Sequence, residues 1–343
     1  MRKLLKTLYI LSVDILLSYD NENILIIQNK KVIDRFPLIT LEGIVTFSQI
    51  APTVPLMAAC ARSNIPLTFL SVYGTFLFRL SDTEHGSVLL RKLHYRISEN
   101  EEVCQSFASI ILDAKLKNSH TVLQRGVRET DDAEKKTRLE NACEHLSSIR
   151  KRMKPNSSVD TLRGLEGVAS TYYFDVLDDL VTQQKDSFHF DVRSTRPPKN
   201  PFNALLSFGY TLLARECTAA LESVGLDSYV GFLHKDRVGR ESLALDLMEE
   251  FRAPMVDRFV LKLINQKIIQ PSHFMKVEED GVYLNDLGKR LFITHWERRK
   301  TESLTHPFLD EKIAWGLVPF AQAQLLVRTM RGEIEKYPAF HWR

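Results

Sequence analysis

Cysteine is scarce in this sequence, and no two cysteines form a CxxC pair. The four residues are scattered along the chain at Cys60, Cys104, Cys143 and Cys217. Zinc ribbons and small disulfide-bonded domains need cysteines at short, repeated spacings, so the sequence excludes both classes. Isolated cysteines are typical of proteins from a reducing compartment, and we therefore expect a cytoplasmic protein.

Several motifs that define large enzyme classes are also missing. The sequence contains no GxxxxGK[ST] phosphate loop, no GxGxxG dinucleotide fingerprint, no HExxH zinc motif and no GxSxG nucleophile turn. The sequence therefore gives no support to the chemistries that these motifs carry.

Long apolar runs are absent as well. Residues 1–20 begin with bases and continue with apolar residues, which superficially resembles a secretory signal. Asp14 interrupts this run, and no small-residue cleavage site follows it. No other stretch approaches the ~20 apolar residues that a membrane-spanning helix needs. We expect neither a signal peptide nor an association with membranes.

The composition is that of an ordinary globular protein. The 343 residues are 44% hydrophobic and 26% charged, which predicts about two folded domains. The net charge of +3 is too small to indicate nucleic-acid binding by itself. Where the basic residues cluster is therefore more informative than how many there are.

The two parts of the chain differ in their hydrophobic pattern. Short runs such as NILIIQN and KVIDRFPL, separated by asparagine-containing turns, predict β-strands in the first 80 residues, with one short helix at 53–64. From residue 88 onward, apolar residues recur every three or four positions, as in amphipathic helices. We expect a linker at 81–87, a long irregular loop at 183–203, and helices near 99–124, 131–153, 158–183, 203–223, 241–269, 285–299 and 308–336. The sequence thus predicts an α+β protein with a β-rich domain at 1–80 and a larger helical domain at 88–343.

Glu166 interrupts an apolar stripe on the helix expected at 158–183. The other positions of this stripe are apolar or aromatic: Val159, Leu162, Ala169, Tyr173, Val176 and Leu180. A buried carboxylate is costly unless a cation or a metal ion compensates it. Gly164 and Gly167 flank Glu166 and leave room for a close approach to the backbone. Pairing with an internal arginine and metal binding both explain Glu166, and this helix alone does not decide between them.

A second candidate site lies in the segment GFLHKDRVGRESLALDLMEEFR, residues 231–252. Asp246 and Glu249 are three positions apart, so their carboxylates lie on one face of a helix. His234 precedes them on an expected loop. Carboxylates with one imidazole suit Mg²⁺ or Mn²⁺, and the nitrogen ligand favours Mn²⁺. An ordinary solvated helix face preceded by a loop histidine is the alternative.

Basic residues stand beside these acids. Lys235, Arg237 and Arg240 lie between the histidine and the helix, and Arg196 lies in the proline-rich segment RSTRPPKN. If the carboxylates hold a metal ion, these cations would bind a polyanion such as a phosphodiester backbone. Salt bridges between the bases and the neighbouring acids are the alternative interpretation.

Three long segments, LRGLEGVASTYYF, RPPKNPFNALLSFGYTLL and GFLHKDRVGRESLALDLMEEFR, occur in this order along the chain. In sequence and spacing they resemble the CRISPR-associated integrase-endonuclease family, the universal adaptation protein called CRISPR-associated protein one. The opening MRKLLKTLYIL and the late segment THPFLDEKIAWGLVPFAQAQLLVRTMRGEIEKYPAF look like its subtype I-C branch. The resemblance spans nearly the whole chain.

The resemblance implies a fold, a set of partners and a metal site. The fold would be a small β-sandwich-like domain followed by an all-helical domain, and two chains would form a homodimer through their β domains. The partners would be a small ferredoxin-like adaptation protein and DNA, both duplex and branched, including the CRISPR repeat and the spacer precursor. Glu166, His234 and Glu249 would be the catalytic metal ligands, with Asp246 as an accessory acid that supports them or holds a second ion.

These observations predict a metal-dependent DNA integrase and endonuclease with Mg²⁺ or Mn²⁺ as its cofactor. A DNA 3′ hydroxyl would attack a phosphodiester of the CRISPR array by transesterification, and His234 could alternatively act as a proton shuttle. Two other hypotheses stay open from the residues alone. One is a non-catalytic helical scaffold that binds nucleic acid, and the other is a metal phosphohydrolase for small phosphates.

Overall fold

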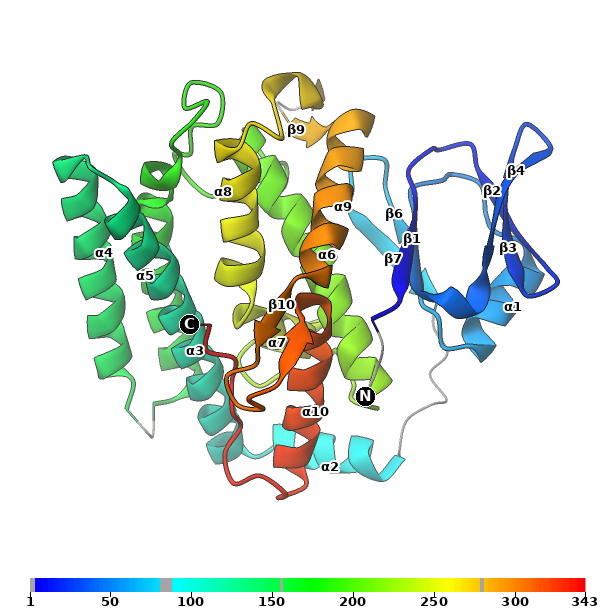
Figure 1. The fold of residues 1–343 in the computed structure, drawn as a ribbon. Helices are drawn as coiled ribbons and strands as arrows, with labels where there is room; N and C mark the ends of the chain where they lie inside the picture. The colour runs from blue at the N-terminus through cyan, green and yellow to red at the C-terminus, as the bar shows by residue number, and fades with distance from the viewer. Residues whose placement is uncertain (1–3, 81–87, 155–156, 278–280, 343) are drawn as a thin grey trace. The chain divides into compact units, whose positions relative to one another are not determined.

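The computed structural model of the 343-residue chain describes residues 4–80, 88–154, 157–277 and 281–342. The chain divides into two compact units, Met1–His85 and Gly86–Arg343 (Figure 1). The linker predicted at 81–87 lies outside the described residues.

The described part of the first unit contains two β-sheets, one α-helix and a short 3-10 helix (Leu38–Thr40). The four-stranded sheet has the order β1 (Lys6–Ile10), β5 (Leu41–Thr46), β6 (Leu67–Leu70), β7 (Phe76–Leu80). Its first three strands are parallel, and β7 is antiparallel to β6. The second sheet is an antiparallel meander of β2 (Leu16–Asp20), β3 (Asn23–Gln28) and β4 (Lys31–Pro37). The α-helix of this unit is α1 (Val54–Arg62).

Turn chemistry and burial explain this unit. Asn21 and Asn29 each adopt a positive φ in the two-residue turns of the meander, a conformation that asparagine tolerates better than most residues. Ile10 and Ile44 from the larger sheet and Leu17 and Ile24 from the smaller sheet are buried in one shared core. Two sheets that enclose one core confirm the predicted β-sandwich-like unit.

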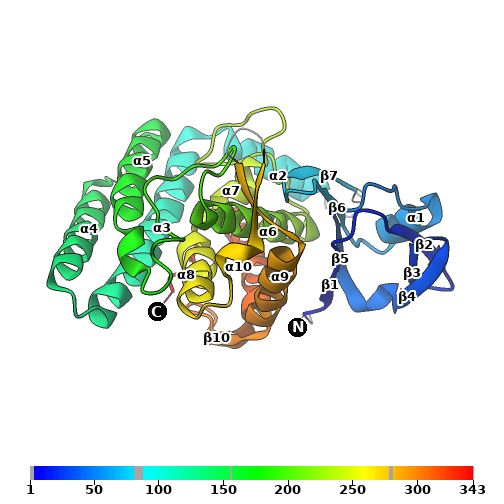
Figure 2. The ribbon, with the colours of Figure 1, turned by 90° about the horizontal axis from the view of Figure 1, so that it is seen from above.

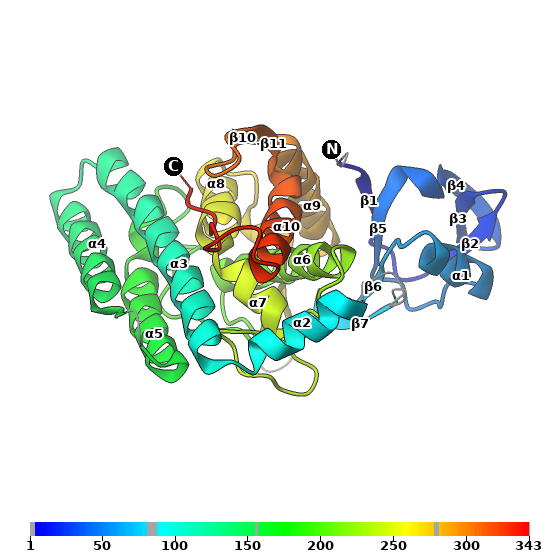
Figure 3. The ribbon, with the colours of Figure 1, turned by 90° about the horizontal axis from the view of Figure 1, so that it is seen from below.

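The second unit is mainly helical. Its longer helices are α2 (Val88–Ser98), α3 (Glu101–Glu129), α4 (Ala133–Arg152), α5 (Val159–Asp175), α6 (Pro201–Ser223), α9 (Asp286–Thr301) and α10 (Val318–Met330). Side chains of Asn100, Asp132, Ser158 and Asn200 cap the starts of α3 to α6 by accepting backbone N–H groups. In Figures 2 and 3, α4 and α5 lie at one end of this unit, and α6 and α9 both lie to the same side of them. None of the described helices is both long and apolar enough to cross a membrane.

The second unit departs from the all-helical expectation at several places. It contains two small antiparallel hairpins, β8 (Phe274–Val277) with β9 (Gly281–Leu284) and β10 (Ser303–Thr305) with β11 (Lys312–Ala314). The helix expected at 308–336 begins only at Val318, because Pro319 fits the first turn of a helix but not its interior. The overall α+β class, with a β-rich first part and a larger helical second part, is confirmed.

The helix expected at 241–269 is broken into three pieces. They are α7 (Ser242–Glu249), a π-helical segment (Arg252–Asp257) and α8 (Arg258–Asn265). Pro254 has no N–H to donate to the helical ladder, which explains a local break in regular α-geometry. Widened π-helical turns occur often at functional sites, and this one begins three residues after Glu249.

Candidate metal-binding active site

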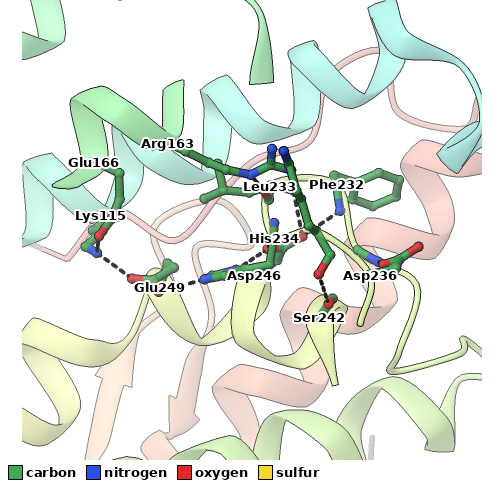
Figure 4. Close-up of polar contacts among 12 residues, drawn as sticks. Lys115, Arg163, Glu166, Phe232, Leu233, His234, Asp236, Ser242, Asp246 and Glu249 are labelled. Atoms are coloured by element: carbon green, nitrogen blue, oxygen red, sulfur yellow. Dashed lines mark hydrogen bonds and ion pairs between the residues drawn. The ribbon is translucent and has the colours of Figure 1, made fainter. Parts of the chain in front are cut away.

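Three residues that the sequence places on separate segments lie around one cavity. Glu166 comes from α5, His234 from the loop between α6 and α7, and Glu249 from the end of α7. All three line a cavity of about 270 Å³. Figure 4 shows their side chains pointing toward one another, with Lys115 of α3 beside them. The structure therefore brings together the three residues predicted to act as one group.

Lys115 lies between the two carboxylates, and sequence analysis missed it. Its ammonium group donates to Glu166 Oε1 and lies 2.9 Å from Glu249 Oε2. Burial opposes the charge of Lys115, but the two carboxylates outweigh this effect and raise its pKa. A lysine on an amphipathic helix normally faces solvent, so nothing in the sequence of α3 indicated this position.

The surroundings of Glu166 differ from the sequence expectation in two ways. Its side chain is 30% exposed, so Glu166 is only partly buried although it stands on an apolar stripe. Its cationic partner is Lys115, and not an arginine. Gly164 and Gly167 face open space, since no atom of the described chain lies within 4 Å of a Cβ built at either position. Within this chain, no close approach to their backbone exists.

Asp246 holds the loop that carries His234. Its Oδ2 accepts the backbone N–H groups of Phe232 at 2.6 Å and Leu233 at 2.9 Å. Its Oδ1 accepts the His234 backbone N–H at 2.9 Å and the ring Nδ1–H at 2.6 Å. Gly231 is required here because a Cβ would lie 2.9 Å from Asp246 Oδ2. Asp246 is completely buried.

This arrangement fixes the orientation of the imidazole. When Nδ1 donates its proton to Asp246, the neutral ring presents the lone pair of Nε2, which lies 3.9 Å from Glu249 Oε1. Arg163 of α5 further anchors the loop by donating from Nε to the Leu233 carbonyl at 2.5 Å. Of the two roles expected for Asp246, these contacts favour support of His234, since both of its oxygens already accept donors.

Glu249 carries a negative charge at any ordinary pH. Burial alone would raise its pKa, but Arg252, Lys115 and His234 outweigh it and lower the pKa of Glu249 to about 2. Arg252 donates from Nε to Glu249 Oε1 at 3.0 Å. The other oxygen, Oε2, is buried and accepts no hydrogen bond, although the Lys115 ammonium is close enough for an ion pair.

The donor set fits a divalent cation. Two carboxylates and one oriented imidazole suit Mn²⁺ or Mg²⁺, and Glu249 Oε2 is a buried oxygen without a hydrogen-bond donor. Within the described residues, no three His, Cys, Asp or Glu side chains are already arranged closely enough to hold a metal ion. Because Lys115 lies between Glu166 and Glu249, an ion that binds both carboxylates must displace its ammonium group.

Asp257 and two tyrosines form another wall of the same cavity. Asp257 accepts the hydroxyl groups of Tyr210 at 2.5 Å and Tyr173 at 2.9 Å. The guanidinium of Arg252 lies over the Tyr210 ring, 4.7 Å from its centroid. Burial raises the pKa of Asp257 to about 6, and the two hydroxyl groups and the arginines only partly oppose this shift.

Asp257→Asn should change the pH dependence of stability. The pKa of about 6 in the folded chain lies above the ordinary value of 3.8. The folded protein therefore keeps a proton between about pH 4 and 6 that the unfolded chain releases, so stability falls as pH rises through this window. Asparagine cannot titrate. Across this window, the free energy of unfolding of the variant should therefore rise by about 3 kcal/mol relative to wild type. The melting temperature of the variant should rise relative to wild type in the same direction. If the difference in melting temperature between the variant and wild type stayed constant from about pH 4 to 7, this assignment would be contradicted.

Glu250, the acid directly after α7, does not line the cavity. Glu250 is completely buried and accepts the Tyr337 hydroxyl at 2.7 Å, the Phe340 N–H at 2.6 Å and the Gln322 amide at 3.0 Å. Burial raises its pKa to about 7. Asn118 of α3 adds donors to the carbonyl groups of Glu250 and Phe340. Glu250 thus ties the end of α7 to the C-terminal segment.

The predicted DNA-binding bases lie outside the cavity lining. Lys235 pairs with Asp160 at 3.2 Å, and Arg196 and Arg237 are exposed. Among the described residues, no ion pair joins Arg237 or Arg240 to Asp246 or Glu250. The proposed salt bridges to these acids therefore do not account for the two arginines.

Arg193, from the predicted loop at 183–203, lines the cavity instead. Its guanidinium donates to Asn203 Oδ1 at 2.8 Å and Ser207 Oγ at 3.1 Å. Both acceptors are neutral, and no described carboxylate forms an ion pair with Arg193. The cavity wall therefore carries a cation whose charge is offset only at longer range, by the neighbouring Tyr210 and Asp257.

Comparison with known proteins identifies similar chains. The family model described as "CRISPR associated protein Cas1" matches residues 8–298. A protein named "CRISPR-associated endonuclease Cas1 1" from Chlorobaculum tepidum is 39% identical over 343 residues and covers 100% of both chains. A CAS1 protein from Thermotoga maritima has the same fold, with a TM-score of 0.82 and 24% identity over 98% of this chain and 100% of that one. A chain in a Cas6-RT-Cas1–Cas2 complex has a TM-score of 0.83 and 22% identity over 98% of this chain and 36% of that one.

Proposed function

This chain belongs to the CRISPR-associated protein Cas1 family, and from this premise we propose that it is a metal-dependent DNA integrase and endonuclease of CRISPR adaptation. The observation that carries the proposal is the convergence of Glu166, His234 and Glu249 on one cavity. The related Chlorobaculum tepidum protein is named an endonuclease, which agrees with a site built for phosphodiester chemistry.

The proposed reaction is a transesterification. A DNA 3′ hydroxyl attacks the phosphorus of a phosphodiester in the repeat, one P–O bond forms and another breaks, and the displaced strand leaves with a free hydroxyl. The number of phosphodiester bonds is conserved, so no external energy source is needed. Hydrolysis is the same reaction with water as the attacking group.

The chain's own side chains prepare this reaction. Glu166, His234 and Glu249 would hold the divalent ion, which when bound lowers the pKa of the attacking hydroxyl and stabilises charge at the phosphoryl group. Asp246 keeps the lone pair of His234 Nε2 directed into the cavity. We prefer the ligand role for His234, while the same orientation would also serve proton transfer.

Positive charge on the cavity wall would hold the scissile phosphate. Arg252 and Arg193 both line the cavity with the proposed ligands, and Lys115 becomes available as a donor once its carboxylates bind metal. Arginine can donate two parallel hydrogen bonds to phosphate oxygens. These residues would therefore orient the phosphate and offset its charge.

The proposed partners follow from the family and the resemblance. We propose that the chain forms a homodimer, binds duplex and branched DNA, and assembles with the small ferredoxin-like adaptation protein. A chain of similar fold occurs in a complex named for both Cas1 and Cas2. Membership of the subtype I-C branch and a cytoplasmic location are further proposals of the same kind.

One assay separates this proposal from its alternatives. The protein and its small partner are incubated with short duplex DNA bearing 3′ hydroxyls and a supercoiled repeat plasmid, with Mn²⁺ or with a chelator. Joined products that require Mn²⁺ are expected. DNA binding without any joined or cleaved product would support the non-catalytic scaffold. Hydrolysis of small phosphate esters without strand joining would support the phosphohydrolase.

Arg237→Ala and Arg240→Ala should weaken DNA binding without weakening metal binding. Each lost phosphate contact should reduce the slope of log affinity against log salt by roughly 0.9 on duplex DNA or about 0.7 on a single strand. The loss should be similar for all sequences, since phosphate contacts do not read bases. Binding is measured in Ca²⁺ to prevent chemistry. Arg328→Ala, which removes an exposed charge from α10, is the matched control. Unchanged slopes for both Arg237→Ala and Arg240→Ala would show that these two arginines do not contact DNA phosphates.

A further inference from the structure

We propose that a cleft along α8 is a second phosphate-binding site, which holds the backbone of a nucleic-acid strand. This cleft is separate from the cavity lined by Glu166, His234 and Glu249, called here the Glu249 cavity. The choice of a nucleic-acid strand as the ligand rests on the proposed function, but the inference does not depend on metal chemistry. Cations of α3, α8 and α9 line this cleft, which has a volume of about 760 Å³. None of its lining residues belongs to the Glu249 cavity.

The two cavities lie on different parts of the same helices. Lys115 of α3 lines the first cavity and Arg125 of α3 lines the cleft, which places them roughly 15 Å apart along the helix axis. At the start of α8, Asp257 faces the first cavity while the next residue, Arg258, faces the cleft. This spacing allows a single nucleic-acid strand to contact both the Glu249 cavity and the cleft.

Arg258 is the central residue of the cleft. Its guanidinium stacks on the Trp342 ring, 4.7 Å from the centroid. Among the described residues it has neither an ion-pair partner nor a hydrogen-bond acceptor, so its N–H donors are available. Burial, together with the neighbouring Arg125 and Arg299, lowers the pKa of Arg258 to about 10, and Glu129 and Glu302 oppose this shift only in part. A partly buried cation beside two others, without its own counterion, is a favourable place for an anion.

Lys262 adds a second cation that no described carboxylate pairs with. It lies four residues after Arg258, on the same face of α8, and lines the same cleft. The other three cations that line the cleft are already paired with acids, and one of them, Lys135, lies 3.8 Å from Asp132. Arg125 pairs with Glu129 at 2.6 Å, and Arg299 is bonded to Glu302. This part of the cleft therefore carries two uncompensated positive charges.

The acids at the other end of the cleft do not cancel these charges. Asp179 pairs with Arg138 at 3.1 Å, and Asp132 caps α4 and lies 3.8 Å from Lys135. Asp131 is the remaining lining acid, and it is exposed. Since the cleft contains no set of ligands or nucleophiles comparable to the Glu249 cavity, its chemistry is binding rather than catalysis.

The ligand chemistry follows from the donors. A guanidinium matches the spacing of two phosphate oxygens, and an adjacent ammonium adds a point charge. A phosphodiester backbone and free inorganic phosphate share this chemistry, and a protein carboxylate is the competing anion. The nucleic-acid strand is favoured because the first cavity, one residue away at Asp257, is the proposed site of DNA chemistry.

The test compares Arg258→Gln, Lys262→Gln and the double variant with wild type. Binding of a fluorescent duplex is measured by anisotropy over a range of salt concentrations in Ca²⁺, so that loss of catalysis cannot imitate loss of binding. Each single variant should lower the slope of log affinity against log salt by about 0.9, and the double variant by about twice as much. Inorganic phosphate should raise the melting temperature of wild type more than that of the double variant.

The controls keep the proposal falsifiable. Arg328→Gln removes an exposed charge from α10 and should leave the slope unchanged. If Arg258→Gln does not fold, Lys262→Glu serves instead, because Lys262 is exposed and its charge reversal should weaken DNA binding further. Unchanged slopes in the folded variants would overturn the proposal. Loss of the phosphate effect with unchanged DNA slopes would overturn the assignment to a nucleic-acid strand.

Discussion

Replacing Glu166 with glutamine should reduce strand joining at least about 100-fold while the protein stays folded. A metal ligand is worth several kcal/mol of transition-state stabilisation, and each 1.36 kcal/mol corresponds to a factor of ten in rate. The substitution keeps the size of the side chain but removes its charge. The measurement is the rate of joining of a 3′-hydroxyl duplex to a repeat plasmid in saturating Mn²⁺.

Stability distinguishes a catalytic loss from a folding defect. In the chain without metal, Lys115 bridges Glu166 and Glu249. The variant would leave Lys115 paired with Glu249, so its melting temperature without metal should stay close to that of wild type. Glu144→Gln, on the exposed face of α4, is the matched control. Joining at the wild-type rate by folded Glu166→Gln would remove Glu166 from the site.

Asp246→Asn should have the second largest effect, on both stability and metal affinity. Four donors converge on this buried carboxylate, and an amide offers only one acceptor oxygen in its place. Each buried donor left without an acceptor costs about 1–3 kcal/mol, so we expect a loss of about 2–4 kcal/mol in the free energy of unfolding. With the imidazole no longer fixed, Mn²⁺ affinity should fall about 10- to 100-fold.

Urea unfolding and Mn²⁺ titration of the same preparation test this prediction. The control is Asp236→Asn in the same loop, because the Asp236 carboxylate accepts a single long hydrogen bond, from the Gly231 N–H at 3.2 Å. Its stability and Mn²⁺ affinity should stay near those of wild type. If Asp246→Asn lowered metal affinity without any loss of stability, Asp246 would be a ligand rather than a support for His234.

The sequence predicted those site residues that are unusual for their position, namely acids among the apolar residues of a helix. Glu166 interrupts an apolar stripe, and Asp246 and Glu249 stand among leucines, so these positions attracted attention before their neighbours were known. The family motif then joined them to His234. Their convergence depends on contacts between α3, α5 and α7, which no local pattern contains.

Other features could not be predicted because their signals are ordinary. Lys115 and Asn118 belong to a long amphipathic helix, where polar residues usually face water, yet both are buried in contacts with α7 or the C-terminal segment. The continuous apolar pattern at 241–269 hid the break at Pro254. Glu250 and Asp246 look alike in the sequence, but Asp246 lies inside α7 and accepts hydrogen bonds from the His234 loop, whereas Glu250 follows the last residue of α7 and accepts hydrogen bonds from the C-terminal segment.

The central claim is that Glu166, His234 and Glu249 bind one metal site together. The most direct test is equilibrium Mn²⁺ binding, followed by the electron paramagnetic resonance signal of the free ion, in wild type, Glu166→Gln, His234→Ala and Glu249→Gln. The account predicts tight binding by wild type and a loss of that binding in each of the three folded variants, with Asp236→Asn unaffected. Wild-type Mn²⁺ affinity in all three variants would contradict it.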